Sequence, residues 1–310
     1  MELTFRQAIE SIAADQRSGA AQVAERAADI LLRRATVDES SSPEAFRKEI
    51  LATGWGLIRA QPAMAPLVNL VNTILWKIAA SESLASLRQA VVAAAQEFKR
   101  RLRQHASSVA EGTLGLIGEG SKIVTLSNSG TIQHALIHAQ RAGRRLEVIC
   151  AESRPGHEGR EAAAFLAHRG VPVTLMLDED AVAAIRHADL VLVGADMLTN
   201  RGLVNKAGTH AMAIAARDCG TPFYTLCGSE KFMPPEFHPI NHEEWLVEDV
   251  WSDTPRGVNI HNAPYDFTPL EAIAGIVTEE GILPIAAVEA WLAAIRLHPA
   301  LAAQTIEEGR

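Results

Sequence analysis

The hydrophobic pattern changes its period once along this chain of 310 residues. From residue 4 to about residue 112, apolar residues recur three and four positions apart, most clearly between Leu67 and Ile78, which predicts helices almost throughout. A polar stretch from Asp38 to Pro43 predicts a loop, and Pro62 with Pro66 brackets the start of a later helix. The first part of the chain is therefore expected to be helical.

From Ser121 onward, short aliphatic segments alternate with helical ones. The predicted strands are Lys122 to Leu126, Leu146 to Cys150, Val171 to Leu177, Leu190 to Val193 and Pro222 to Leu226. Helices around 132–140, 160–168, 181–187 and 208–217 separate them, which indicates a parallel sheet with helices on both faces. The predicted fold class is α/β, with an N-terminal helical domain at 1–115 followed by a Rossmann-like parallel sheet domain at 116–310. The GxGxxG fingerprint is missing, and no cofactor is expected.

One polar cluster follows the most apolar of these strands. Leu190 to Val193 contains no polar residue, as expected for a strand covered on both faces, and Asp196 comes directly after it. Ligands of open α/β sheets bind beyond the carboxyl ends of strands. Asn205 and Lys206 then precede a helix, where a lysine and free N–H groups favour an anion such as a phosphate. Simpler interpretations remain open, because Asp196 also suits an Asx turn or a cap and Gly208 to Thr209 suits a plain helix start.

Polar residues follow the other predicted strands as well. A turn that opens a helix, and whose N–H groups suit a phosphate, follows the first strand and contains Ser127, Asn128, Ser129, Gly130 and Thr131. The second strand is followed by Glu152 to Arg160, which includes Arg154, and the fifth by Gly228 to Lys231. Because parallel strands end at one edge, these groups are expected to meet in a pocket for a phosphorylated sugar. Glu158, Arg160 and Glu230 are interpreted as helix caps or surface ion pairs.

The sequence GAD at 194–196, a polar turn and NKAGT at 205–209 resemble a known superfamily. It contains methylthioribose-1-phosphate isomerase, ribose-1,5-bisphosphate isomerase and the alpha, beta and delta subunits of eukaryotic translation initiation factor 2B. TPFYTLCGSEKF at 221–232 and YDFTPLEAIAGIVTEEGILP at 265–284 resemble further segments of it, so the resemblance covers roughly residues 115 to 290. The segment at Tyr265 is similar to one that closes the dimer interface of family members. The resemblance therefore implies a homodimer or a dimer-based higher oligomer.

The resemblance also implies catalytic positions, because the isomerases use a cysteine and an aspartate. The aspartate matches Asp196, whereas Ser127 stands where the isomerases have their cysteine, in a turn similar to that of the regulatory subunits, which lack isomerase activity. A serine hydroxyl is far less acidic than a thiol and needs a neighbouring base to transfer a proton. Asp196 in a dry crevice is expected to have a raised pKa. Both an aldose–ketose isomerase acting on a ribose 1-phosphate type substrate and a protein that only binds such a ligand remain open.

The helical part contributes further predicted ligand contacts. Arg17, Ser18, Gly19 and Ala20 match a family loop that approaches the substrate phosphate, and a simple turn between helices is the alternative. Arg59 to Pro62 match a family segment with arginine before proline, but Gln61 replaces that arginine here. An amide still binds a phosphate oxygen but supplies no charge. The predicted substrate-binding residues are Arg17, Ser18, Gly19, Ala20, Arg59, Gln61, Asn128, Ser129, Gly130, Thr131, Arg154, Asn205 and Lys206.

Composition narrows the classes of partner. The net charge of −8 argues against a nucleic-acid binder, and the basic run from Lys99 to Arg103 is interpreted as a solvated helix end. Three cysteines without CxxC spacing indicate free buried thiols in a reducing compartment and no metal site. The first residues lack a signal-peptide pattern and no apolar run reaches eighteen residues, so a cytoplasmic protein without membrane contact is expected. The alternative to a phosphorylated small-molecule ligand is a regulatory or assembly protein that acts through its dimer surface.

Overall fold

The computed structural model describes residues 3–237 and 247–302. Its first part is helical, with α1 (Leu3–Ala13), α2 (Ala20–Val37), α3 (Pro43–Ala60), α4 (Ala65–Ala79) and α5 (Leu84–Thr113). Serine caps start two of these helices: Ser42 accepts a hydrogen bond from the N–H of Ala45, and Ser83 forms a capping box with Ser86. The apolar faces of the five helices meet in one core. The prediction of helices for this part is confirmed.

Beyond residue 120, strands and helices alternate. They are β1 (Ser121–Thr125), α6 (Gly130–Arg141), β2 (Leu146–Ala151), α7 (Glu158–Ala167), β3 (Val173–Met176), α8 (Asp178–Ala184), β4 (Leu190–Val193), α9 (Thr209–Cys219), β7 (Phe223–Leu226), β9 (Gly275–Thr278), β10 (Gly281–Leu283) and α10 (Ile285–Ala293). The strands form one sheet in the order β10-β9-β7-β4-β1-β2-β3, in which only the edge strand β10 is antiparallel. The predicted parallel sheet is confirmed, and β9 and β10 extend it beyond the predicted strands.

A second, smaller sheet lies beside the carboxyl ends of the large one. It consists of β5 (Met197–Leu198), β6 (Gly202–Lys206) and β8 (Tyr265–Pro269), and all its pairs are antiparallel. Short 3-10 turns complete the fold: η1 (Ile185–His187), η2 (Ser229–Lys231), η3 (Val247–Asp249) and η4 (Leu270–Ala272). Strand β6 carries the predicted site residues Asn205 and Lys206 on a paired strand rather than in a loop.

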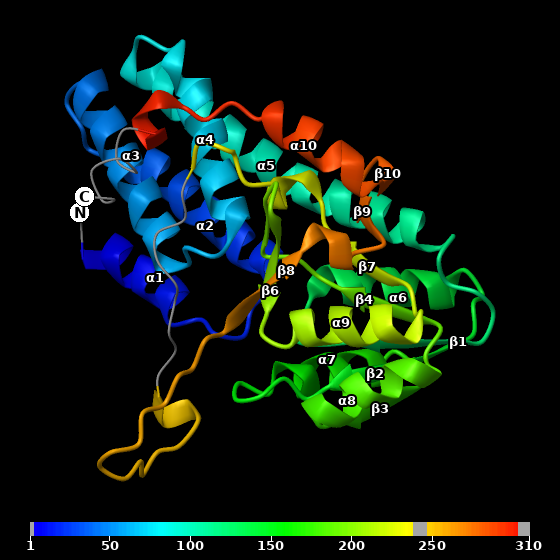
Figure 1. Cartoon of the computed structure of the whole chain (residues 1–310). Helices are drawn as coiled ribbons and strands as arrows, with labels where there is room; N and C mark the ends of the chain where they lie inside the picture. The colour runs from blue at the N-terminus through cyan, green and yellow to red at the C-terminus, as the bar shows by residue number, and fades with distance from the viewer. Residues whose placement is uncertain (1–2, 238–246, 303–310) are drawn as a thin grey trace.

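Helix α5 joins the helical part to the sheet. Its first turns, including Val91 and Phe98, pack in the core of the helices, whereas Val109 and Ala110 pack with α6 and the sheet. Helices α8, α9 and α10 cover the opposite face of the sheet (Figure 1). Because one 30-residue helix belongs to both packing layers, the loops of the helical part are held in a fixed place relative to the strand ends.

The strand order creates a switch point between β1 and β4. From β1 the chain builds outward through β2 and β3, and it then returns to the other side of β1 with β4 and β7. The loops after β1 and β4 therefore leave the sheet in opposite directions and open a crevice at their carboxyl ends. Ser127 and Asp196 stand directly after these two strands.

Two surface features complete the description. The segment around η3 projects away from the body of the molecule (Figure 1). Cys150 and Cys227 are buried as predicted, but Cys219 is exposed because it ends α9 at the surface, which corrects the prediction for this thiol. Among the described residues, no helix is both long and apolar enough to cross a membrane.

Candidate functional site

A cavity of about 450 Å³, including its open mouth, lies at the switch point. Its walls come from the start of α2, the loop after β1 with the start of α6, the loop after β4, strand β6 and the turn η2. The lining residues are Gly19, Ala20, Ala21, Gln22, Leu126, Ser127, Asn128, Ser129, Gly130, Thr131, Gly194, Ala195, Asp196, Asn205 and Lys231. Segments from both parts of the chain thus enclose one polar space.

Two glycines allow the walls to approach one another. A Cβ on Gly19 would lie 3.3 Å from the carbonyl oxygen of Asn128, so the loop before α2 rests against the turn after β1. A Cβ on Gly194 would lie 2.5 Å from the hydroxyl oxygen of Ser129, which leaves no room for any side chain. Glycine is therefore required at Gly194 for the loops after β1 and β4 to meet.

Asp196 lies at the cavity wall with its backbone fixed. Its N–H donates to the carbonyl of Val204 at 3.1 Å, and its carbonyl accepts from the N–H of Ala65 at 3.0 Å. The side chain is partly buried, and it accepts no hydrogen bond from any residue in the described part of the chain. Burial raises the pKa of Asp196 to about 6, and the charges of Lys231 and Lys206 limit that rise. A carboxyl with this pKa exchanges a proton near neutral pH.

Lys231 supplies a buried positive charge on the same cavity. Lys231 is only 3% exposed. Its Nζ donates to the Thr131 hydroxyl at 3.5 Å, a long and weak hydrogen bond. Within residues 3–237 and 247–302 the ammonium group has no closer polar partner. A buried ammonium group with unused donors favours a bound anion or hydroxyl group.

The turn after β1 adds donors from the backbone. Ser129 caps α6 by accepting from the N–H of Ile132, whereas the N–H groups of Gly130 and Thr131 have no partner inside the helix. These groups and the helix dipole favour an anion at this end of α6. Ser127 has a φ of 60°, a region that few non-glycine residues adopt. The turn is thus shaped to face the cavity, and Lys231 approaches it through Thr131.

The predicted pair Asn205 and Lys206 divides between two roles. Asn205 is buried, lines the cavity and donates to the Thr209 hydroxyl at 2.9 Å. Lys206 does not line the cavity, because its ammonium group forms a buried ion pair with Glu158, the first residue of α7. Burial lowers the pKa of Lys206, and the Glu158 carboxylate opposes this shift. Glu158 had been interpreted as a cap or a surface pair, and its 3% exposure corrects the surface interpretation.

Side chains of the protein hold the loop before α2 in place. Asp15 accepts hydrogen bonds from the N–H groups of Arg17 and Ser18, at 3.0 and 2.9 Å. Gln61 is buried, and its Nε2 donates to the carbonyls of Ile12 and Asp15 at 2.9 Å each. The structure therefore places Gln61 behind the loop instead of at the cavity.

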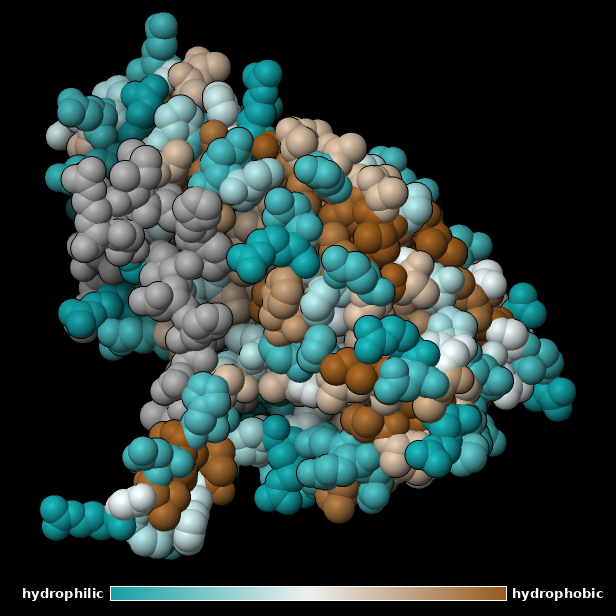
Figure 2. Space-filling view, viewed as in Figure 1, coloured by the Kyte–Doolittle hydropathy of each residue, from teal (hydrophilic) through white to brown (hydrophobic). Residues whose placement is uncertain are grey.

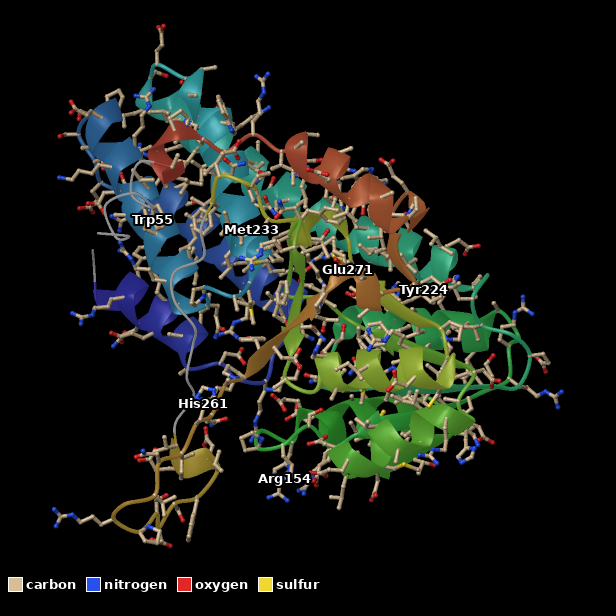
Figure 3. All side chains as sticks on the ribbon, viewed as in Figure 1. Trp55, Arg154, Tyr224, Met233, His261 and Glu271 are labelled. Carbon is tan, nitrogen blue, oxygen red and sulfur yellow. The ribbon has the colours of Figure 1, made fainter. Side chains whose placement is uncertain are left out.

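Three predicted arginine contacts lie outside the cavity. Arg17 is exposed and forms an ion pair with Glu161 at 3.2 Å. Arg59 is exposed and lies over the Trp55 ring, 5.5 Å from its centre. Arg154 is exposed on the loop before α7, at the edge of the molecule (Figure 3). Their roles as ligand contacts stay predictions that this geometry does not favour.

Nine of the predicted residues do line one cavity. They are Gly19, Ala20, Ser127, Asn128, Ser129, Gly130, Thr131, Asp196 and Asn205. Lys231 lines the cavity but is not among the predicted ligand contacts. The feature of the sequence that points to it is its position after a predicted strand. No group of three or more metal-binding side chains occurs in the part of the chain that the structure describes.

Comparison with known proteins places this geometry in a family. The family model for the initiation factor 2 subunit family matches residues 16–285. Ribose 1,5-bisphosphate isomerase from Haloferax volcanii is 32% identical over 274 residues, which cover 86% of this chain and 84% of that protein.

Two solved structures share the fold. The crystal structure of the Pyrococcus horikoshii translation initiation factor eIF-2B has a TM-score of 0.80 and 28% identity, and the match covers 92% of this chain and 98% of that one. 5-methylthioribose 1-phosphate isomerase from the same organism has a TM-score of 0.73 and 20% identity, with 98% and 87% covered, so it supports the fold alone. The chain belongs to the initiation factor 2 subunit family.

Proposed function

We propose that the chain binds a small phosphorylated sugar, a pentose phosphate or a nucleoside monophosphate, in the switch-point cavity. The observation that carries this proposal is the buried ammonium group of Lys231, whose one hydrogen-bond partner in the described part of the chain is the Thr131 hydroxyl at the start of α6. A phosphate takes up the charge of Lys231 and the free N–H groups of Gly130 and Thr131.

The remaining lining groups suit a sugar rather than an apolar ligand. Hydroxyl and amide side chains come from Ser127, Asn128 and Asn205, and Asp196 adds a carboxylate. Sugar hydroxyls both donate and accept hydrogen bonds, so they match such a mixed lining. The Haloferax volcanii relative, named ribose 1,5-bisphosphate isomerase, supports a ligand of this class.

If the chain turns its ligand over, the reaction that fits is an aldose–ketose isomerisation. For a ribose 1-phosphate, the C1–O4 ring bond breaks and O4 takes a proton, carbon two and its hydroxyl group each lose a proton, and carbon one gains a proton, so the redox change is internal to the sugar. Asp196, with a pKa of about 6, acts as the acid or the base. Ser127 occupies the place of the second catalytic group but lacks the acidity of a thiol.

Titration calorimetry of the wild-type chain tests binding. The ligands are ribose 1-phosphate, AMP and ribose 1,5-bisphosphate, and the proposal expects saturable heat with at least one of them. A turnover assay by phosphorus NMR with the same ligands then separates a binder from an isomerase. No heat with any of these ligands would contradict the proposal.

A second candidate function is regulatory assembly through the dimer surface. The segment that projects from the body carries apolar side chains in water: Val250, Trp251 and Val258 are 51%, 48% and 46% exposed. They form an apolar cluster on this projection (Figure 2). Exposed apolar clusters of this kind favour contact with another chain, and we propose a homodimer that uses this segment.

Sedimentation tests the assembly. Trp251→Glu is expected to shift a dimer toward monomer, because a charge in an apolar interface is costly. Leu177→Glu is the matched control, since Leu177 is 51% exposed outside this segment. Equal sedimentation of both variants and the wild type would remove this segment from the interface.

A further inference from the structure

The first turn of α7 places two carboxylates against Lys206 and Arg17, two predicted phosphate contacts that do not line the cavity. Glu158 and Glu161 are three residues apart and so lie on one side of the helix. Glu158 forms the buried ion pair with Lys206, and Glu161 lies 3.2 Å from Arg17. Both cations belong to the predicted phosphate contacts. The structure shows each of them already beside a carboxylate of the protein.

The pair formed by Glu158 and Lys206 is the stronger of the two. Glu158 is 3% and Lys206 is 5% exposed, so little water screens their charges. The pair of Arg17 and Glu161 is exposed on both sides, where such contacts stabilise little. Lys206 therefore has its charge compensated within the fold, whereas Arg17 remains open to solvent.

Glu158 also occupies a position that resembles an anion site. The start of a helix and a nearby lysine favour a bound anion, and here both surround the chain's own carboxylate. The Oε2 atom of Glu158 is buried, and no described residue forms a hydrogen bond with it. A second negative group brought to Lys206 would have to displace Glu158 or lie beside this unpaired oxygen.

Among the residues that the structure describes, Lys231 is the one cationic side chain that lines the cavity, and it offers its charge to one phosphate. Lys231 remains as its buried cation, together with the N–H groups at the start of α6. A phosphate monoester carries about −1.5 to −2 charges near pH 7, and a bisphosphate carries about twice that. We propose that Glu158 is a specificity-determining residue, which compensates Lys206 and so makes the cavity accept a sugar with a single phosphate in preference to a bisphosphate. This inference rests on the proposed function.

Calorimetry with two ligands and two proteins tests this proposal. The ligands are ribose 1-phosphate and ribose 1,5-bisphosphate, and the proteins are the wild type and Glu158→Gln. The wild type is expected to bind the bisphosphate no more tightly than the monophosphate. Glu158→Gln removes the charge but keeps the shape, so Glu158 no longer compensates the positive charge of Lys206 and the affinity for the bisphosphate is expected to rise at least about tenfold. The affinity for the monophosphate is expected to stay within about threefold.

Two further variants test whether the change in affinity comes from the charge of Glu158 acting on Lys206 or from the loss of any carboxylate near the cavity. Glu161→Gln removes the exposed carboxylate and is expected to change neither affinity by more than about threefold. The double variant Glu158→Gln with Lys206→Gln lacks the released cation and is expected to lose the gain for the bisphosphate. A gain that persists in the double variant overturns the role given to Lys206.

The outcomes distinguish this inference from the proposed function. A wild type that binds the bisphosphate more than about tenfold tighter than the monophosphate overturns the inference but keeps the sugar-phosphate site. A folded Glu158→Gln variant with the same ratio of bisphosphate to monophosphate affinity as the wild type also overturns the inference and keeps the sugar-phosphate site. If that variant does not fold, the wild-type ratio decides alone. No heat with either ligand overturns both.

Discussion

The backbone N–H of Ser127 donates a 2.7 Å hydrogen bond to the side-chain oxygen of Ser153. This bond ties the turn after β1 to the turn after β2. Ser127 and Ser153 both have a positive φ, 60° and 63°, a backbone conformation that residues other than glycine seldom adopt. Such conformations persist where neighbouring contacts hold them, and they concentrate at functional sites. Ser153 is thus the residue that keeps Ser127 in place beside the cavity.

Replacing Ser153 with alanine is expected to loosen the turn at Ser127. The N–H of Ser127 loses its partner, and the free energy of unfolding is expected to fall by about 1 to 2 kcal/mol. Ligand affinity is expected to fall as well, because the cavity loses part of its preorganised wall. Chemical denaturation and calorimetry measure the two effects. Ser107→Ala, on the exposed side of α5, is the control. Equal changes in unfolding free energy and ligand affinity in the two variants would show that the bond between Ser127 and Ser153 does not hold the turn.

Asp196→Asn is expected to change how stability depends on pH. The pKa of Asp196 in the folded chain is about 6, above its ordinary value of 3.8, so the folded chain holds the proton more tightly than the unfolded chain. The stability from this group is fully present below about pH 4 and is lost as pH rises through 6. The asparagine variant removes this loss and is expected to be more stable at pH 7 by up to roughly 2 to 3 kcal/mol.

Denaturation of the wild type and Asp196→Asn between pH 4 and 8 checks this expectation. The difference in the free energy of unfolding is expected to grow from pH 4 to about pH 6 and then stay level. We expect the variant to fold and to keep weak ligand binding. An unfolded variant would instead identify the carboxylate as a structural cap.

Gln61→Ala tests the role that the structure gives to this residue. Its Nε2 donates to the carbonyls of Ile12 and Asp15. The Ile12 carbonyl also accepts from the N–H of Asp15, so among the described residues the loss of Gln61 leaves the Asp15 carbonyl without a donor. The free energy of unfolding is expected to fall by about 1 to 3 kcal/mol. Gln104→Ala, on the exposed side of α5, is the matched control. A stable Gln61→Ala variant that has lost ligand binding would favour direct contact with the ligand instead.

Ser127→Cys tests whether the missing thiol limits turnover. The substitution restores the residue type that the resemblance places at this turn in the isomerases. General acid–base groups contribute about 10²- to 10⁴-fold, so turnover of a pentose phosphate is expected to rise at least about tenfold. Ser127→Ala is the control for loss of the hydroxyl. Cysteine and alanine variants with equal turnover would show that this position does not transfer the proton.

The sequence pattern predicts more of the fold than of the functional site. The aliphatic run Leu190–Val193 predicts a strand buried on both faces because it is short, lacks a polar residue and lies between helical stretches, and the structure confirms this strand. Strand β6 escaped prediction because Asn205 and Lys206 break its apolar pattern, and pairing with β8 decides its structure. The division of the chain into domains at residues 115 and 116 stays a prediction.

The sequence predicts a site residue only where its place directly after a strand is enough to bring it to the cavity. Asp196 and the turn at Ser127 to Thr131 follow from their places after strands. The environment of Lys206 depends on a glutamate 48 residues away, and that of Lys231 depends on a threonine 100 residues away. No local pattern reports such contacts. The sequence therefore indicated which edge of the sheet holds the cavity, but not which lysine faces it.

The most direct measurement is the affinity of Lys231→Met for ribose 1-phosphate, by calorimetry beside the wild type and Lys122→Met. Lys122 is a strand lysine that does not line the cavity. Loss of a charge-assisted hydrogen bond is expected to weaken binding by about 10- to 100-fold in Lys231→Met, with Lys122→Met unchanged. Wild-type affinity in a folded Lys231→Met variant would contradict the phosphate site at the switch point.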